Sequence, residues 1–199
     1  MITLARLAST VAALALAVTP AQAAVHVFNT SLSGLNEVPA VISPGGGFAL
    51  VTVDDAAFTM RVVASFSGLS GITTAAHIHC CAPIGSNAAV ATTTPSFVGF
   101  PLGVTAGSMD QTYDMALASS YRAAFITGNG GTVPTAFNAL LAGLQANRAY
   151  FNVHTTAFPG GEIRGQLTLV PEPSGWALML SGFGALAGAL RTRRRLRLA

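Results

Sequence analysis

The sequence has no lysine, only two cysteines and few charged residues of any kind, which make up 9% of its 199 residues. The formal net charge of +3 comes from the two ends of the chain, because residues 24–170 hold four arginines and six carboxylates. With its histidines neutral, this body carries four minus six, or −2. A nucleic-acid-binding surface needs clustered basic residues, so no nucleic-acid partner is expected.

Motifs of the common catalytic classes are also missing. The serines lack the nucleophile elbow of hydrolases, and the carboxylates are scattered along the chain. Gly45-Gly46-Gly47 precedes an apolar stretch that is typical of a strand, which predicts a turn and not a phosphate-binding loop. We therefore expect a non-enzymatic protein.

Apolar residues are concentrated at the two ends, which raises the hydrophobic share to 51% and the mean hydropathy to +0.57. Residues 1–23 combine Arg6, an apolar run over residues 7–18 and the small-residue site Ala21-Gln22-Ala23. This order is typical of a secretory signal peptide cut after Ala23. It predicts an N-terminal signal helix, export through the Sec translocon and a body that folds outside the cytoplasm.

Residues 171–199 begin with Pro171-Glu172-Pro173, continue through an apolar run at 176–190 and end in an arginine cluster. The run is short for a span of about 20 residues, but its basic flank favours a transmembrane helix with the arginines in the cytoplasm. This order resembles the PEP-CTERM sorting signal of Gram-negative bacteria. The resemblance implies anchoring in the inner membrane, cleavage by an exosortase and release to the cell surface or into an exopolysaccharide matrix. A plain C-terminal anchor is the alternative.

The body, residues 24–170, consists mainly of short stretches of alternating polarity separated by Gly, Pro, Asn or Asp. Residues 48–53 and 58–66 flank Asp54-Asp55 and are expected to form a hairpin. Residues 116–147 change to a helical period, and Pro134 is expected near the first turn of the second of two short helices. These patterns predict a mainly β domain, an antiparallel two-sheet β-sandwich with short inserted helices.

The histidines gather in two stretches that lie far apart in the sequence. If residues 74–78 are extended, the alternation places His77, His79 and Cys81 on one face. In residues 150–154 the same alternation places His154 with Tyr150 and Asn152. The two stretches are expected to be partners in one sheet.

Three converging imidazoles favour a copper or zinc site at His77, His79 and His154, with Cys81 as a soft ligand. His26, near the mature N-terminus, is a weaker candidate for copper. The alternative is that these histidines bond to backbone carbonyls and close the sandwich.

Cys80 and Cys81 are the two cysteines of a chain that is expected to be exported, where thiols tend to be oxidised. Neighbouring Cα atoms lie about 3.8 Å apart, below the usual disulfide range of about 4.4 to 6.8 Å, so a bond between them would be strained. It is the only pairing within one chain. A bridge between two chains and Cys81 as a metal ligand are the alternatives.

Glu162 and Arg164 share one face of a predicted strand and are expected to form a structural ion pair, with Glu37 as another partner for Arg164.

Three segments of the body together resemble a known family. LSGLNEVP at residues 32–39, FSGLSGITTAAHIH at 66–79 and AYFNVHTTAFPGGEIRGQL at 149–167 resemble the signatures of the CHRD domain, named from chordin. The resemblance covers residues 25–169 and implies an immunoglobulin-like β-sandwich in a secreted protein without a generally established enzymatic activity. The HIHCC segment and residues 82–147 depart from the animal members, so growth-factor binding is not carried over.

GLSGITTAAHIH, residues 68–79, is also similar to the glycine-rich strand before the paired copper-ligand histidines of Cu/Zn superoxide dismutase. The later zinc histidines and aspartate of that enzyme have no counterparts here, so the similarity supports metal binding more than dismutation. We expect a cell-surface or matrix protein, with a copper- or zinc-binding protein as the first alternative and a redox enzyme as the second.

Overall fold

The computed structural model describes residues 24–171 and residue 183. The predicted signal helix lies outside the described residues, and so does the predicted C-terminal transmembrane helix apart from Phe183. Of the sorting motif, only Pro171 is described. None of the helices in the described part of the chain has the length and hydropathy of a membrane span.

The body is built mainly from strands. They are β1 (Val25–Ser33), β2 (Gly46–Asp54), β3 (Thr59–Ser67), β4 (Thr73–Cys80), β5 (Gly107–Asp114), β6 (Ala149–Thr155), β7 (Ile163–Gln166) and β8 (Thr168–Leu169). Short helical turns, η1 (Gly34–Asn36) and η2 (Ala118–Ser120), and two α-helices, α1 (Ala123–Gly128) and α2 (Val133–Gln145), lie between them.

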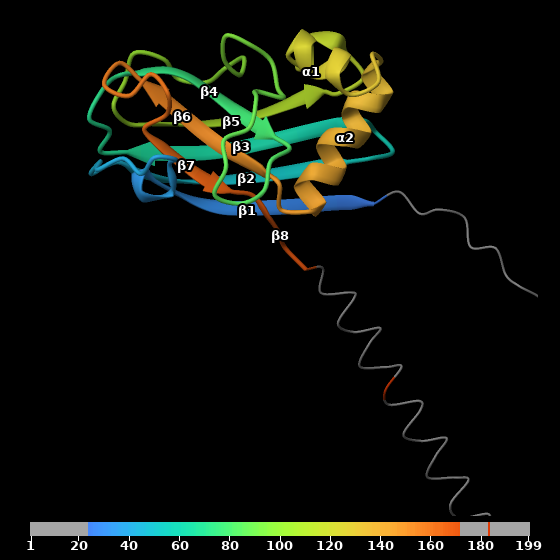
Figure 1. Cartoon of the computed structure of the whole chain (residues 1–199), viewed down its shortest axis with the longest axis horizontal. Coiled ribbons are helices and arrows are strands. Elements are labelled where there is room, and N and C mark those ends of the chain that lie inside the picture. Colours follow the sequence, from blue (N-terminus) through green and yellow to red (C-terminus); the bar gives the residue numbers. More distant parts are fainter. Residues whose placement is uncertain (1–23, 172–182, 184–199) are drawn as a thin grey trace, which may run out of the picture.

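The strands form one antiparallel sheet in the order β4-β6-β7-β1-β2-β3-β5, with β8 beside β1. The sheet curls, so that β4 and β6 lie across β2 and β3 (Figure 1). The fold therefore differs from the two separate sheets of the predicted sandwich. The reason is β7, which pairs with β6 on one side and with β1 on the other and so joins the two halves.

The hydrophobic core lies inside this curl. Phe28, Val51 and Val62 enter it from β1, β2 and β3, and Ile78 and Phe151 enter it from β4 and β6, all with no exposed surface. Because side chains alternate along a strand, the neighbours of Ile78 and Phe151 point to the opposite face of β4 and β6. That second face carries the histidines.

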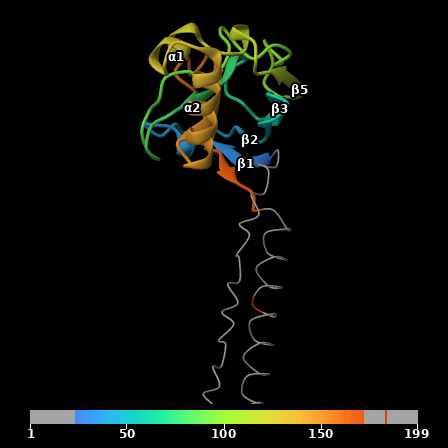
Figure 2. The same ribbon diagram turned by 90° about the vertical axis from the view of Figure 1, so that its right-hand side faces the viewer.

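The predicted hairpin and helices are present. β2 and β3 pair over their full length, from Gly46 with Ser67 to Asp54 with Thr59. Thr132 and Thr135 form a capping box at the start of α2, and Pro134 lies in its first turn, where a missing N–H costs nothing. Helix α2 runs across one end of the curled sheet (Figure 2).

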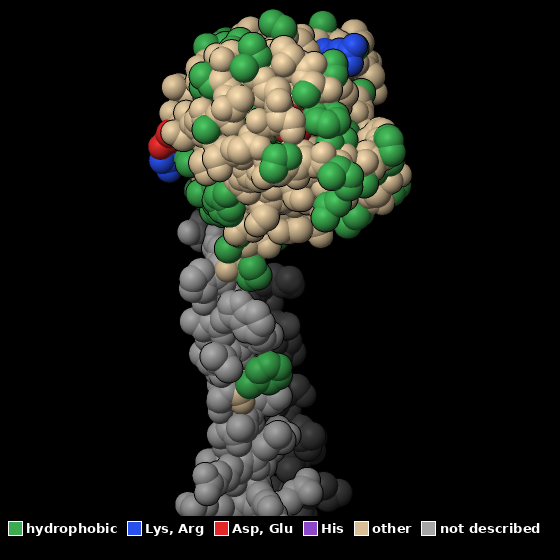
Figure 3. Space-filling model, turned by 90° about the vertical axis from the view of Figure 1, so that its left-hand side faces the viewer, with side chains coloured by type: hydrophobic (Ala, Val, Ile, Leu, Met, Phe, Trp, Pro, Cys, Tyr) green, Lys and Arg blue, Asp and Glu red, His purple; other side chains and the backbone are tan. Residues whose placement is uncertain are grey.

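The surface of the domain is poor in charge. On the face shown in Figure 3, charged side chains are few and hydrophobic side chains are scattered among polar groups. This agrees with the small number of charged residues in the sequence. Such a surface offers little electrostatic steering of charged partners.

We expect Gly143→Ala to lower the free energy of unfolding by about 1 to 3 kcal/mol through overpacking. Gly143 lies on the buried side of α2, and a methyl group there would collide with the Sγ atoms of Cys80 and Cys81. The better helix propensity of alanine, about 1 kcal/mol, offsets part of this loss. Thermal unfolding followed by circular dichroism measures the change. Gly128→Ala is the matched control, because a methyl group at this helical glycine meets nothing within 4 Å. Equal melting temperatures for the two variants would contradict the close packing of α2 on the cysteines.

Candidate metal centre

Two neighbouring strands bring the three histidines together. His77 and His79 lie on β4 and His154 lies on β6, which pairs with β4 as the sequence predicts. Asn152 is directly opposite His77, and Ala75 is opposite His154, so His154 is the diagonal neighbour of His77. The ring centroids lie 5.2 Å apart for His77 and His154, 5.7 Å for His79 and His154, and 5.9 Å for His77 and His79.

Each imidazole uses one ring nitrogen to bond a backbone carbonyl of a loop. The contacts are His77 Nε2 to Pro95 O at 2.8 Å, His79 Nδ1 to Ala88 O at 2.9 Å and His154 Nδ1 to Pro159 O at 3.0 Å. A carbonyl oxygen only accepts hydrogen bonds, so these nitrogens carry the proton. In the neutral rings, the opposite nitrogens therefore carry free lone pairs.

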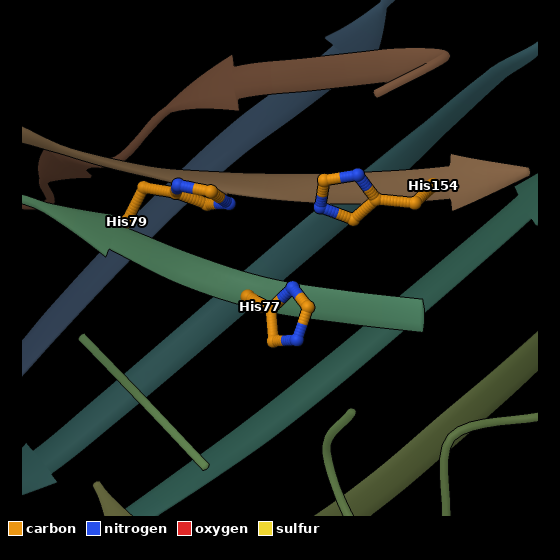
Figure 4. Close-up of side chains that lie close together, drawn as sticks. All are labelled: His77, His79 and His154. Atoms are coloured by element: carbon orange, nitrogen blue, oxygen red, sulfur yellow. The ribbon is translucent and has the colours of Figure 1, made fainter. Parts of the chain in front are cut away.

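These opposite nitrogens point toward a common space. His77 Nδ1, His79 Nε2 and His154 Nε2 are buried and have no hydrogen-bond partner among the described residues. Figure 4 shows one nitrogen of each ring turned toward the other two rings. The three residues offer ligand atoms that all lie within 4.8 Å of one another.

Burial keeps the rings neutral at neutral pH. Burial is the main cause that lowers the pKa of His77 and of His79 to about 4, and His154 adds to the shift of both. Burial also lowers the pKa of His154. The neutral imidazole is the form that binds a metal ion.

The set fits a transition-metal ion. Imidazole nitrogens suit copper and zinc, and a nitrogen binds zinc at about 2.0 to 2.1 Å, which places tetrahedral ligand nitrogens about 3.4 Å apart. Ligand atoms within 4.8 Å of one another reach this spacing when the rings move inward by about 1 Å. The carbonyl bonds meanwhile keep each ring in the tautomer that the metal needs.

Tyr150 and Arg164 support His79 from the side. The Tyr150 ring stacks on the His79 ring with centroids 4.8 Å apart, and the Arg164 guanidinium lies 4.5 Å from the Tyr150 centroid. The Tyr150 hydroxyl accepts a hydrogen bond from Ala88 N at 3.1 Å, and Ala88 O is the partner of His79. Sequence reasoning placed Tyr150 on this face but gave it no role.

The predicted ligand Cys81 is not part of the cluster. It forms a disulfide with Cys80, and its Sγ lies 3.6 Å from Ala139 O of α2. The chain leaves β4 at Cys80, so the strand alternation that placed Cys81 beside His79 no longer applies. His26 also lies apart, with Nε2 3.5 Å from Asp55 Oδ2.

The predicted pair of Glu162 and Arg164 is replaced by two separate contacts. Arg164 Nε lies 3.7 Å from Glu37 Oε2, the other partner considered, and donates to Asn36 O at 2.6 Å. Glu162 accepts hydrogen bonds from Ser43, Thr155 and two backbone amides. Among the described residues no ion pair joins Glu162 to Arg164, because the two side chains reach different loops.

We expect the metal-free protein to lose stability as the pH falls from about 6.5 to about 4. The ordinary histidine pKa is 6.5, whereas His77 and His79 titrate at about 4 in the folded chain. The unfolded chain therefore binds more protons in this window, and the free energy of unfolding falls with the pH. Burial raises the pKa of Glu37 to about 7, which acts in the opposite direction, but Glu37 is one group, whereas the lowered pKa values of His77, His79 and His154 all act in the same direction.

Melting temperatures recorded between pH 7 and pH 4.5 with a chelator present measure this slope. His79→Gln removes one of these buried histidines and should flatten the slope. An equal slope in this variant would show that buried neutral histidines do not control the acid sensitivity.

Comparison with known families matches the part of the chain that contains the histidine cluster. A model of the CHRD domain matches residues 28–167, a segment that holds all three histidines of the cluster. No curated protein and no solved structure matches the chain. The domain suggests an extracellular or secreted protein, which fits the export predicted from residues 1–23. The chain thus belongs to the CHRD domain family.

Proposed function

We propose that this protein is an exported metal-binding protein that holds one copper or zinc ion through His77, His79 and His154. The observation that carries the proposal is the set of three buried lone pairs turned toward one space. The opposite nitrogen of each ring is fixed by a backbone carbonyl. This is the outer-shell arrangement of histidines that ligate metals.

A purely structural role explains only half of this arrangement. Bonds to Pro95, Ala88 and Pro159 would close the loops over the sheet with one nitrogen per ring. The other three nitrogens would then remain buried without a partner, at about 1 to 3 kcal/mol each. A bound metal ion satisfies all three at once, so metal binding accounts better for the geometry.

Elemental analysis of the protein after incubation with copper and zinc and extensive dialysis tests the proposal. We expect about one metal ion per chain, since three imidazoles serve one ion. His154→Gln, a change at the half-buried histidine, should abolish retention without unfolding the domain. His26→Gln is the matched control, because His26 lies apart from the cluster, and it should retain the metal. No retained metal, or equal retention in both variants, would refute the site.

The route to the cell surface is a second part of the proposal. It rests on the sequence of residues 1–23 and 171–199. The Sec translocon exports the chain, the C-terminal helix holds it in the inner membrane, and an exosortase cleaves at Pro171-Glu172-Pro173. The body is then released to the cell surface or the exopolysaccharide matrix. Replacing the three motif residues by alanine should leave the protein in the inner-membrane fraction. Release of this variant at the normal rate would contradict sorting.

Contact with a matrix polymer is a second candidate function, favoured by one pocket. It has a volume of about 420 Å³, and the buried Glu37 and Arg164 line it together with Asn36 and Gln166. Leu35 and Ile84, each 69% exposed, form its apolar rim. This mixture of donors, acceptors and apolar surface suits a hydroxyl-rich ligand. The role is non-catalytic.

Co-sedimentation with the extracellular polysaccharide of the producing cells tests this contact. Ile84→Glu should weaken it, whereas Ile42→Glu, at another exposed isoleucine outside the pocket lining, should not. Equal binding by both variants would exclude the pocket.

A further inference from the structure

The histidine cluster has no negative charge of its own. Its three ligands are neutral imidazoles, and the described residues add no carboxylate or thiolate to the group. Cys81 is bonded to Cys80, Glu37 lies beside Arg164, and Glu162 is held by other hydrogen bonds. A cation bound there keeps its full charge.

A charged pair lies behind His79. The Arg164 guanidinium is 4.5 Å from the centroid of the Tyr150 ring, which stacks on His79, and Arg164 Nε is 3.7 Å from Glu37 Oε2. The arginine offsets the charge of this carboxylate, so the pair does not compensate the charge of a bound cation. The cost of moving an ion from water into a buried site grows with the square of its charge. A divalent ion therefore meets about four times the desolvation cost of a monovalent ion.

The number of available ligands points the same way. Zinc is almost always four-coordinate in proteins, and where three protein ligands bind it, a water or a substrate completes the set. Here the three free nitrogens are buried, and loops carrying Ala88, Pro95 and Pro159 are bonded to the rings. Because bulk water does not reach these three nitrogens in this arrangement, a water ligand would need added space beside the ion. Monovalent copper, with a filled d shell, is stable with three nitrogen ligands.

We infer that this site takes monovalent copper in preference to divalent zinc, an inference that rests on the metal-binding function proposed above. The lower charge of Cu(I) and its stability with three ligands both favour it at this site. The site would then store or pass on the reduced ion without a change in its oxidation state.

Competition titrations with the full-length protein test the inference. Cu(I) is supplied without oxygen as its acetonitrile complex, so that no thiol reductant opens the Cys80–Cys81 disulfide, and it competes with a chromophoric Cu(I) chelator. Zn(II) is titrated in parallel against a zinc chelator. We expect the dissociation constant for Cu(I) to be lower than that for Zn(II) by about 1,000-fold or more. Ag(I), a redox-inert monovalent ion of the same d-electron count, should bind like Cu(I).

The variants separate this inference from the function on which it rests. His154→Gln and His79→Gln should both lose Cu(I), while His26→Gln should keep it, and circular dichroism reports whether each remains folded. Zn(II) binding as tight as that of Cu(I), lost in the same two variants, would overturn the preference and leave the metal function intact. Binding of neither ion, or Cu(I) binding that survives both substitutions, would overturn the histidine site itself.

Discussion

Replacing Glu162 by alanine is expected to lower the free energy of unfolding by about 3 to 5 kcal/mol. The Glu162 carboxylate has no exposed surface. It accepts hydrogen bonds from Ser43 Oγ and Thr155 Oγ1, each at 2.6 Å, and from the backbone N–H groups of Ser70 and Gly71. Alanine would leave four donors without this acceptor, two of them on the buried residues Gly71 and Thr155, and the donors come from three separate parts of the chain. Urea unfolding measures the loss.

The matched control is Asp110→Ala. Asp110 forms an exposed ion pair with Arg61, and solvent screens such pairs, so its loss should cost much less than the loss of Glu162. Equal destabilisation by the two substitutions would contradict the role of Glu162 as a buried acceptor.

The hydrogen bonds of Glu162 also predict how the stability of the protein changes with pH. Burial raises the pKa of Glu162, but hydrogen bonds from Ser43, Ser70 and Thr155 outweigh it and hold the pKa below its ordinary value of 4.5. A lowered folded pKa means that the stabilisation is present at neutral pH and is lost as the pH falls through that pKa. Glu162→Gln should therefore be less stable than the native protein at pH 7 and closer to it in acid.

Adding the metal ion that the protein retains should raise the melting temperature by roughly 8 °C at a free metal concentration 100-fold above the dissociation constant. The reason is that His154 joins His77 and His79 only in the folded state, so the ion binds the folded chain far better than the unfolded chain. This corresponds to about 2.7 kcal/mol of added stability. Differential scanning calorimetry against a chelator-treated sample measures the shift.

His154→Gln should abolish this shift, and His26→Gln should preserve it. The two substitutions are chemically identical, so they separate ligand loss from the general effect of removing an imidazole. An undiminished shift in His154→Gln would place the metal elsewhere.

Strand periodicity predicted much of the candidate site. Alternation from the strands expected at residues 74–78 and 150–154 put His77, His79 and His154 on one face, and the pairing of β4 with β6 follows from the same pattern. The tautomers could not be predicted, because the carbonyls that fix them belong to Ala88 and Pro95, in a loop without regular structure, and to Pro159.

Other parts of the fold are only weakly indicated by the sequence pattern. Strand β5, with the sequence GSMDQTYD, was not predicted, because it buries little apart from Met109 and pairs with the distant β3. The number of sheets depended on β7, a strand of four residues that links the two halves. Glu162 lies just before β7, so its contacts follow the loops around Ser43 and Ser70 and not the strand alternation.

The most direct test of the central claim is X-ray absorption spectroscopy of the metal-loaded protein at the edge of the bound metal. The three-histidine site predicts three nitrogen scatterers at about 2.0 Å, with the outer-shell pattern of imidazole rings. It also predicts no sulfur shell at about 2.3 Å, because Cys80 and Cys81 are bonded to each other. A sulfur shell, or fewer than two imidazoles around the ion, would contradict the site.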